Sequence, residues 1–236
     1  MIRTSIAALL ASAVAFPALA TTYSTIDLSS VANARFSTSG FINGNTYPTG
    51  SPLQLDGVPY LLPESGNYMW HSANQFFGGS GGTHSVTIPV ALFGIDSVYT
   101  LMGTWWGERS SGSYASIQFN GETDTHVVEL DGGAVIRDYN YNPSYTTSLD
   151  PAVAKEVWAN GSGPGTQHID RQFFDLPDSF SHQTLVSITL TDSGSDGFQR
   201  SFIAGVTVSA IPEPATWALL LGGLLATGAV ARRRLR

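Results

Sequence analysis

The feature that most constrains the fold is an alternation of apolar and polar residues with a period of two. It is clearest over 85–90, 186–191 and 201–208; in the first of these, every second residue from Val86 is valine or isoleucine. Successive side chains of a β-strand point to opposite faces. The pattern therefore predicts half-buried strands, with one face on the core and the other in water.

A fourth alternating segment, Ala115 to Phe119, runs directly into Asn120-Gly121, which is a strong hairpin signal because both residues accept a positive φ. The best helix candidate is short, at 151–159. Many short strands with glycine-rich turns predict an all-β fold, a single β-sandwich or jelly roll over residues 21–209. Further candidate strands are 98–102, 127–130 and 172–176.

The N-terminus has the pattern of a secretory signal peptide over residues 1–20. Arg3 precedes an apolar stretch from Ile6 to Phe16, and Ala18-Leu19-Ala20 has the small-x-small form that signal peptidase recognises. We expect cleavage after Ala20, so that the mature chain begins at Thr21. An uncleaved N-terminal anchor is the alternative interpretation.

The C-terminal segment, residues 210–236, combines a proline-rich start, an apolar run and a basic end. Pro212, Glu213 and Pro214 precede 17 uncharged residues, 215–231. As a helix these would span about 26 Å, close to the ~30 Å hydrocarbon core of a bilayer. Such a run predicts a transmembrane helix, although a buried core helix would also be uncharged. The arginines that follow are Arg232, Arg233, Arg234 and Arg236, and positive charge of this kind keeps the adjoining end in the cytoplasm.

This order of motif, span and basic end, together with the signal peptide, resembles the PEP-CTERM sorting signal of exported bacterial proteins. The resemblance implies that the tail enters the inner membrane and that an exosortase recognises the motif and removes or exchanges the tail. The final location would be the cell surface or the extracellular matrix.

The exported part between the two end segments is strongly acidic. Residues 21–211 hold 6 Lys and Arg against 17 Asp and Glu, a net charge near −11, and the chain contains no cysteine. A charge of this sign excludes nucleic acid as a natural partner. Without cysteine, neither disulfides nor thiolate metal sites are possible, so the domain depends on its own core.

A second resemblance concerns the body of the chain. The stretches 47–63, 97–107 and 198–208, with the Trp70-His71 pair, are similar to exported galactose-binding-like jelly rolls. That resemblance implies a β-sandwich and carbohydrate as the class of ligand.

Aromatic residues are the candidate ligand-stacking positions. Trp105 and Trp106 are adjacent, so in a strand one indole should be buried and the other exposed. An exposed indole is a good platform for the C–H face of a sugar. We predict stacking by Trp105, Trp106, Trp70 and Tyr139; the competing interpretation is that these rings fill the core.

The sequence contains no convincing catalytic motif. Residues 78–82 fit G-x-S-x-G, but a strand pattern follows where the nucleophile elbow needs a helix. Carboxylates in the turns 120–124 and 191–197 could hold a structural Ca²⁺ ion, although neither stretch has EF-hand spacing.

The combined hypothesis is a non-enzymatic envelope or matrix protein that binds or resides in exopolysaccharide. Two alternatives stay open: a structural surface protein without a specific ligand, and a glycan-active hydrolase or lyase. The predicted partners are exosortase, signal peptidase, the inner membrane before processing, and extracellular polysaccharide.

Overall fold

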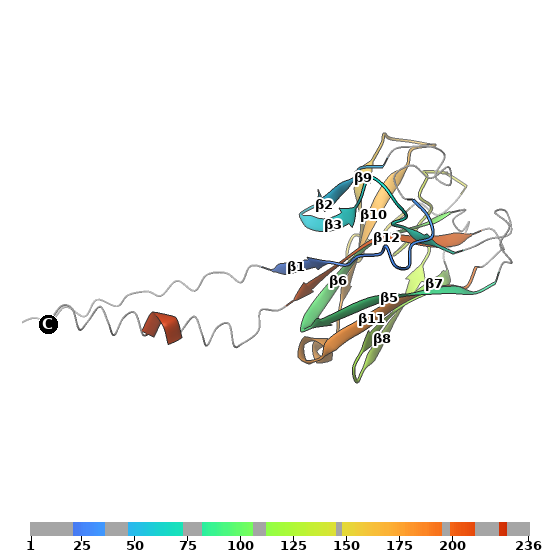
Figure 1. Cartoon of the computed structure of the whole chain (residues 1–236). Coiled ribbons are helices and arrows are strands. Elements are labelled where there is room, and N and C mark those ends of the chain that lie inside the picture. Colours follow the sequence, from blue (N-terminus) through green and yellow to red (C-terminus); the bar gives the residue numbers. More distant parts are fainter. Residues whose placement is uncertain are drawn as a thin grey trace, which may run out of the picture.

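The computed structural model of the chain describes residues 21–35, 47–72, 82–105, 112–144, 148–194, 199–210 and 222–225. The named elements are almost all strands (Figure 1). They are β1 (Thr22–Thr25), β2 (Gly50–Leu55), β3 (Val58–Leu62), β4 (Trp70–His71), β5 (His84–Phe93), β6 (Ile95–Trp105), β7 (Ser113–Gly121), β8 (Thr125–Asp131), β9 (Ala154–Ala159), β10 (His168–Asp175), β11 (Thr184–Asp192), β12 (Arg200–Ala210) and the 3₁₀ helix η3 (Asp178–His182).

The strands form two main antiparallel sheets and one hairpin. The larger sheet has the order β1-β12-β6-β10-β9, with β4 paired to β12, and the smaller sheet has the order β5-β11-β7-β8. Strands β2 and β3 pair only with each other. Consecutive strands often lie in different sheets, so the chain crosses between the layers repeatedly (Figure 1).

The main core lies between the two sheets. Ile117 and Leu190 of the smaller sheet and Val98 and Val206 of the larger sheet belong to one buried cluster, each at most 1 % exposed. Side chains from two facing sheets fill one interior, which is the arrangement of a β-sandwich. The all-β fold predicted from the alternation is thus confirmed.

A second buried cluster covers the opposite face of the larger sheet. Tyr60 of the β2–β3 hairpin packs there with Leu101 of β6 and Ala204 of β12. A Cβ at Gly205 would lie 2.9 Å from a ring carbon of Tyr60, so the hairpin approaches too closely for a larger residue. Strand β12 is therefore buried on both faces, and the expectation that its 201–208 pattern leaves one face in water is wrong.

Strand β11 departs from the predicted alternation at its start. The register between β11 and β7 shifts between Leu185 and Ser187, so Val186 is an extra residue with no partner position on β7. Val186 is 45 % exposed, and Leu185 takes the core position instead. A β-bulge changes the face to which the following side chains point. The alternation of residue types over 186–191 does not reveal such a bulge.

Two local predictions need correction. The β7–β8 hairpin is present, but Asn120 pairs with Thr125, and the amide of Gly121 donates to the carbonyl oxygen of Asp124 at 2.8 Å. Asn120-Gly121 therefore ends β7, and the turn is formed by the residues that follow, 122–124. The stretch 151–159, which was the best helix candidate, is a turn followed by β9, because pairing with β10 supplies the backbone hydrogen bonds.

The first and last strands lie side by side. Strand β1 pairs with β12 in antiparallel register, with Thr22 opposite Ala210 (Figure 1). The start of β1, just after the predicted cleavage site at Ala20, and the end of β12, just before the predicted sorting motif, thus meet at one end of the sheet.

Candidate functional site

Three of the four aromatic residues singled out from the sequence are packing residues in this structure. Trp70, Trp105 and Tyr139 are 8 %, 7 % and 5 % exposed. Trp105 contacts Tyr139 edge-on, with ring centroids 6.1 Å apart, inside the cluster beneath the β2–β3 hairpin. Stacking on a sugar needs an exposed ring face, and none of these three rings offers one. Trp106 lies outside the described residues.

A cluster of charged side chains, partly buried, lies beside β9 and β10. The guanidinium of Arg137 donates to both carboxylate oxygens of Asp170 at 2.7 Å, and to Glu156 at 2.8 Å. Burial alone would disfavour the charged guanidinium, but the hydrogen bonds and charge of Asp170, and then of Glu156, outweigh it and raise the pKa of Arg137. The pair is a bidentate ion pair of the strong type.

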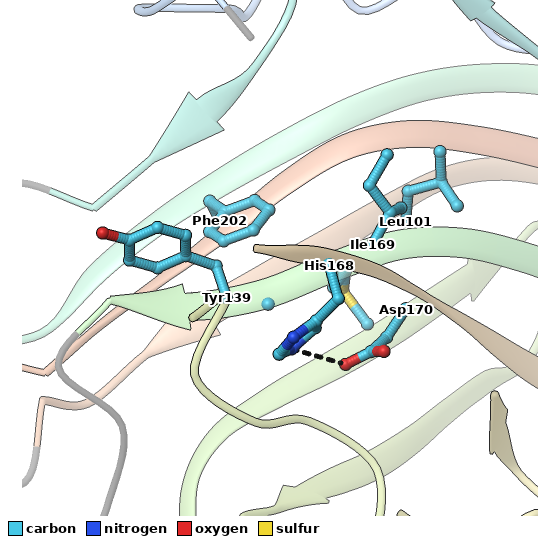
Figure 2. A pocket seen from close by; sticks show the side chains of 8 residues that line it. Leu101, Tyr139, His168, Ile169, Asp170 and Phe202 are labelled. Carbon is cyan, nitrogen blue, oxygen red and sulfur yellow. Dashed lines mark ion pairs between the residues drawn. The ribbon is translucent and has the colours of Figure 1, made fainter. Parts of the chain in front are cut away.

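His168 sits beside this ion pair. Its Nε2 lies 3.5 Å from a carboxylate oxygen of Asp170 and has no hydrogen-bond partner (Figure 2). Burial is the main cause that lowers the pKa of His168; Asp170 acts in the opposite direction and Arg137 in the same one. The imidazole is thus neutral at pH 7.

The cavity next to His168 is very small. It measures about 10 Å³ and is bounded by Tyr139, Phe202 and strand residues of β6 and β10 (Figure 2). That volume holds about one water molecule. The His168 site therefore has no room for a substrate or a sugar ring.

One of the turn carboxylates considered for Ca²⁺, that of Asp192, is held by protein partners. Asp192 is buried, and its carboxylate accepts hydrogen bonds from the amides of Ser201 at 2.8 Å and Gly194 at 2.9 Å, and from the Ser72 hydroxyl. Across the described ranges, no group of three or more His, Asp and Glu side chains is placed to hold a metal ion. Residues 195–198 of the second turn lie outside those ranges, and the Ca²⁺ ion stays a prediction.

A broad exposed feature is the outer face of the smaller sheet, formed by the side chains of β5, β11, β7 and β8 that point away from the core. Cross-strand register aligns them in rows, which are mostly serine, threonine, asparagine and glutamine. One row is Ser85, Thr191, Ser116 and Glu129; the next is Thr87, Thr189, Gln118 and Val127; the third is Pro89, Ser187, Asn120 and Thr125.

Hydrogen bonds between these side chains hold the outer face together. The hydroxyls of Thr87 and Thr189 lie 3.1 Å apart, and the amide of Asn120 donates to Thr189 at 3.2 Å. Gln118 in turn donates to the amide oxygen of Asn120. Each hydroxyl or amide keeps further donor or acceptor capacity, so the face presents a pre-ordered array to solvent.

An apolar spot adjoins the polar rows. Phe93, at the end of β5, is 52 % exposed, and Val186 at the bulge is 45 % exposed. Phe93 pairs with Thr184, two residues from Val186 along β11, which makes the two apolar residues diagonal neighbours. Phe93 was not among the residues predicted from the sequence, because its exposure follows from a register that only the paired strands reveal.

The outer face carries no positive charge. Strands β5, β7, β8 and β11 contain no lysine or arginine, and the exposed carboxylates are those of Glu129 and Asp131 on the edge strand β8. A surface of this composition can exchange hydrogen bonds with a neutral hydroxylated ligand. It offers nothing to neutralise a polyanion.

The predicted end segments lie largely outside the described residues. These include the cleavage residues Ala18 and Ala20, the motif Pro212 to Pro214, and the arginines at 232–236. Within the predicted span, only residues 222–225 are described, as a single helical turn. Among the described residues, no helix is both long and apolar enough to cross a bilayer.

Comparison with known proteins identifies the C-terminal segment. Residues 210–234 match the family model of the PEP-CTERM protein-sorting motif, as the resemblance of that segment predicted. No match to the chain was found among curated proteins. The chain carries a PEP-CTERM sorting motif, and this motif implies export, processing by an exosortase and sorting to the cell surface.

Proposed function

We propose that the exported domain binds neutral extracellular polysaccharide without altering it, and that it does so through the outer face of the smaller sheet. One observation carries the proposal: hydroxyl and amide side chains stand in rows on an exposed sheet face. The strands of this face contain no lysine or arginine. Sorting to the cell surface, which the motif implies, would bring the domain into contact with extracellular polymers.

The chemistry of the outer face suits a chain of neutral sugars. Sugar hydroxyls both donate and accept, as do Thr189, Gln118 and Asn120, so many pairings of similar energy are available along the rows. Phe93 supplies an exposed ring against which the C–H face of a pyranose can pack. The side-chain hydrogen bonds already present reduce the ordering that binding would otherwise require.

Three finer features belong to the same proposal. The sandwich is a jelly roll of the galactose-binding-like kind, which the antiparallel pairing and the repeated crossing between sheets support. A signal peptide directs export and is removed after Ala20. The tail spans the inner membrane until sorting, after which the domain stays at the surface or in the matrix.

Affinity electrophoresis tests the binding step. The full-length protein, purified in mild detergent, is run through gels that contain dextran, soluble cellulose or alginate. We expect retardation in at least one neutral gel and none in alginate. Phe93→Ala and Thr189→Val should each reduce the retardation severalfold.

Tyr141→Ala is the matched control, because Tyr141 is also an exposed aromatic, at 37 %, but lies outside the smaller sheet. A folded protein that is retarded by no neutral polysaccharide would instead favour a structural surface protein without a ligand. A shortened glycan product after incubation would favour the hydrolase or lyase alternative.

Intact mass and terminal sequencing of the native protein test the processing step. We expect a product that begins at Thr21 and ends near Pro212 to Pro214. A full-length C-terminus found only in the inner membrane would mean that the tail is a permanent anchor.

A further inference from the structure

A second surface feature lies away from the outer face, at the other sheet. An open hollow of about 560 Å³ is bounded by the segment that follows β1, by β3 and by the connection from β3 to β4. Its volume is within the range of small-molecule sites, roughly 300–1,000 Å³. The polar side chains that line it are Asp27, Ser29, Ser51, Ser65, Asn67 and Tyr68.

The hollow contains one carboxylate, that of Asp27. Its Oδ1 accepts a hydrogen bond from the amide of Ser29 at 2.8 Å. This backbone hydrogen bond is the main cause that lowers the pKa of Asp27, and the Ser29 side chain adds to it. The carboxylate is therefore ionised at neutral pH and fixed in direction.

The charged groups on the segments that form the hollow make its net charge negative, with Asp27 as the carboxylate in the lining. Over the described residues 21–35 and 47–72, the one lysine or arginine is Arg35, and its guanidinium donates to the backbone carbonyl oxygen of Glu64 at 2.5 Å. Burial lowers the pKa of His71, the histidine of these ranges. The carboxylate of Glu64, which is exposed, adds a second negative charge on the same connection. A cationic ligand group is thus favoured here, and an anionic one is not.

The rest of the lining is mixed in character. Leu61, Pro63 and Ala32 give apolar contact area, while serine hydroxyls and the Asn67 amide give hydrogen-bonding groups. Tyr68 is almost fully buried, and its hydroxyl donates to the carbonyl oxygen of Ile26 at 3.3 Å, which holds the ring in the wall. A ligand for this site has C–H surface, several hydroxyls and one positive charge.

We infer that the hollow binds an amine-bearing hydroxylated ligand of monosaccharide size, with its ammonium group on Asp27. An amino-sugar residue has this chemistry. The site is distinct from the proposed polysaccharide face, because it is built from the segment after β1, from β2 and β3 and from the β3–β4 connection, and because it favours a cationic rather than a neutral ligand.

Ligand-observed NMR and calorimetry on the full-length protein in mild detergent test the assignment. The probes are glucosamine, glucose, N-acetylglucosamine and glucuronate. We expect glucosamine to bind about tenfold more tightly than glucose or N-acetylglucosamine, the usual gain from one charge-assisted hydrogen bond. Glucuronate should bind most weakly.

Asp27→Asn keeps the shape and the acceptor for Ser29 but removes the charge, so it should reduce glucosamine affinity to that of glucose. Asp124→Asn makes the same charge change in the β7–β8 turn and should have no effect. The assignment is overturned if the wild-type protein does not prefer glucosamine over N-acetylglucosamine, a comparison that needs no variant. It is also overturned if folded Asp27→Asn retains the preference.

The two proposals fail separately. Loss of retardation in dextran and cellulose gels, with the glucosamine preference intact, would count against the outer face and support the hollow. If the retardation in dextran and cellulose gels persists and the glucosamine preference is absent, only the proposal for the hollow is overturned.

Discussion

Replacing Asp170 by Asn should be among the most destabilising single polar changes in the domain. The Asp170 side chain is 1 % exposed and the partner Arg137 side chain is 9 % exposed, with two hydrogen bonds between them at 2.7 Å. The change leaves a guanidinium buried beside a neutral amide. Glu156 then remains as the nearby carboxylate that the structure pairs with Arg137.

The expected magnitude follows from burial. Breaking a buried ion pair by removing one partner costs about 3–5 kcal/mol, because the other charge is left uncompensated. Glu156 contacts the same guanidinium at 2.8 Å, but its side chain is 48 % exposed. Water screens that pair, so Glu156→Gln should cost about 0–1 kcal/mol. Each variant removes one negative charge beside the same arginine, yet the two costs should differ several-fold.

Urea denaturation of the purified protein, followed by tryptophan fluorescence, measures both free energies of unfolding. A double variant, Arg137→Met with Asp170→Leu, serves as a third arm. It should be less destabilised than Asp170→Asn alone, since neither charge remains buried. The argument from burial would be refuted if Asp170→Asn cost less than about 1 kcal/mol. It would also be refuted if Glu156→Gln cost as much as Asp170→Asn.

Three further predictions use the same denaturation assay. Gly103→Ala should lose about 1–3 kcal/mol, because a Cβ there would lie 2.7 Å from a phenylalanine ring carbon, while Gly112→Ala, with no atom within 4 Å, should be near neutral; equal costs would contradict this packing. Leu185→Ala should lose about 2–5 kcal/mol and Val186→Ala within about 0.5 kcal/mol, and the opposite order would mean that the bulge is placed wrongly. The lowered pKa of His168 means that the unfolded chain takes up a proton near pH 6.5 while the folded chain does not, so stability should fall below that pH by at most ~1.4 kcal/mol per unit. In His168→Gln this decline should be shallower, and an unchanged pH profile would show that the folded imidazole titrates normally.

Much of the fold could be predicted from local pattern. The alternation from Val86 and from Ala115 identified β5 and β7 correctly, and all-β architecture followed from the number of such segments. The errors came where a non-local contact changed the outcome. The alternation over 201–208 predicts that β12 is half-exposed, but the β2–β3 hairpin covers its second face.

The candidate site was less predictable than the fold. Trp105 and Tyr139 were chosen by residue type, and the same covering hairpin places both rings in a core. Phe93 was not chosen, although it is an exposed aromatic among the described side chains of the smaller sheet. Exposure depends on which layer lies above a strand, and residue type alone does not carry that information.

What the sequence by itself determined are the features read locally along the chain. These are the strand period, the acidic charge and the sorting signal at 210–234, which a family model recognises without any folded context. What only the tertiary structure decided is which residues share a surface. Thr87 and Thr189 are 102 positions apart and form one row of the outer face, and Asp27 meets Asn67 at one hollow. The physical reason is that strand period is a property of one backbone, whereas register and coverage depend on distant segments that pair only when the chain has folded.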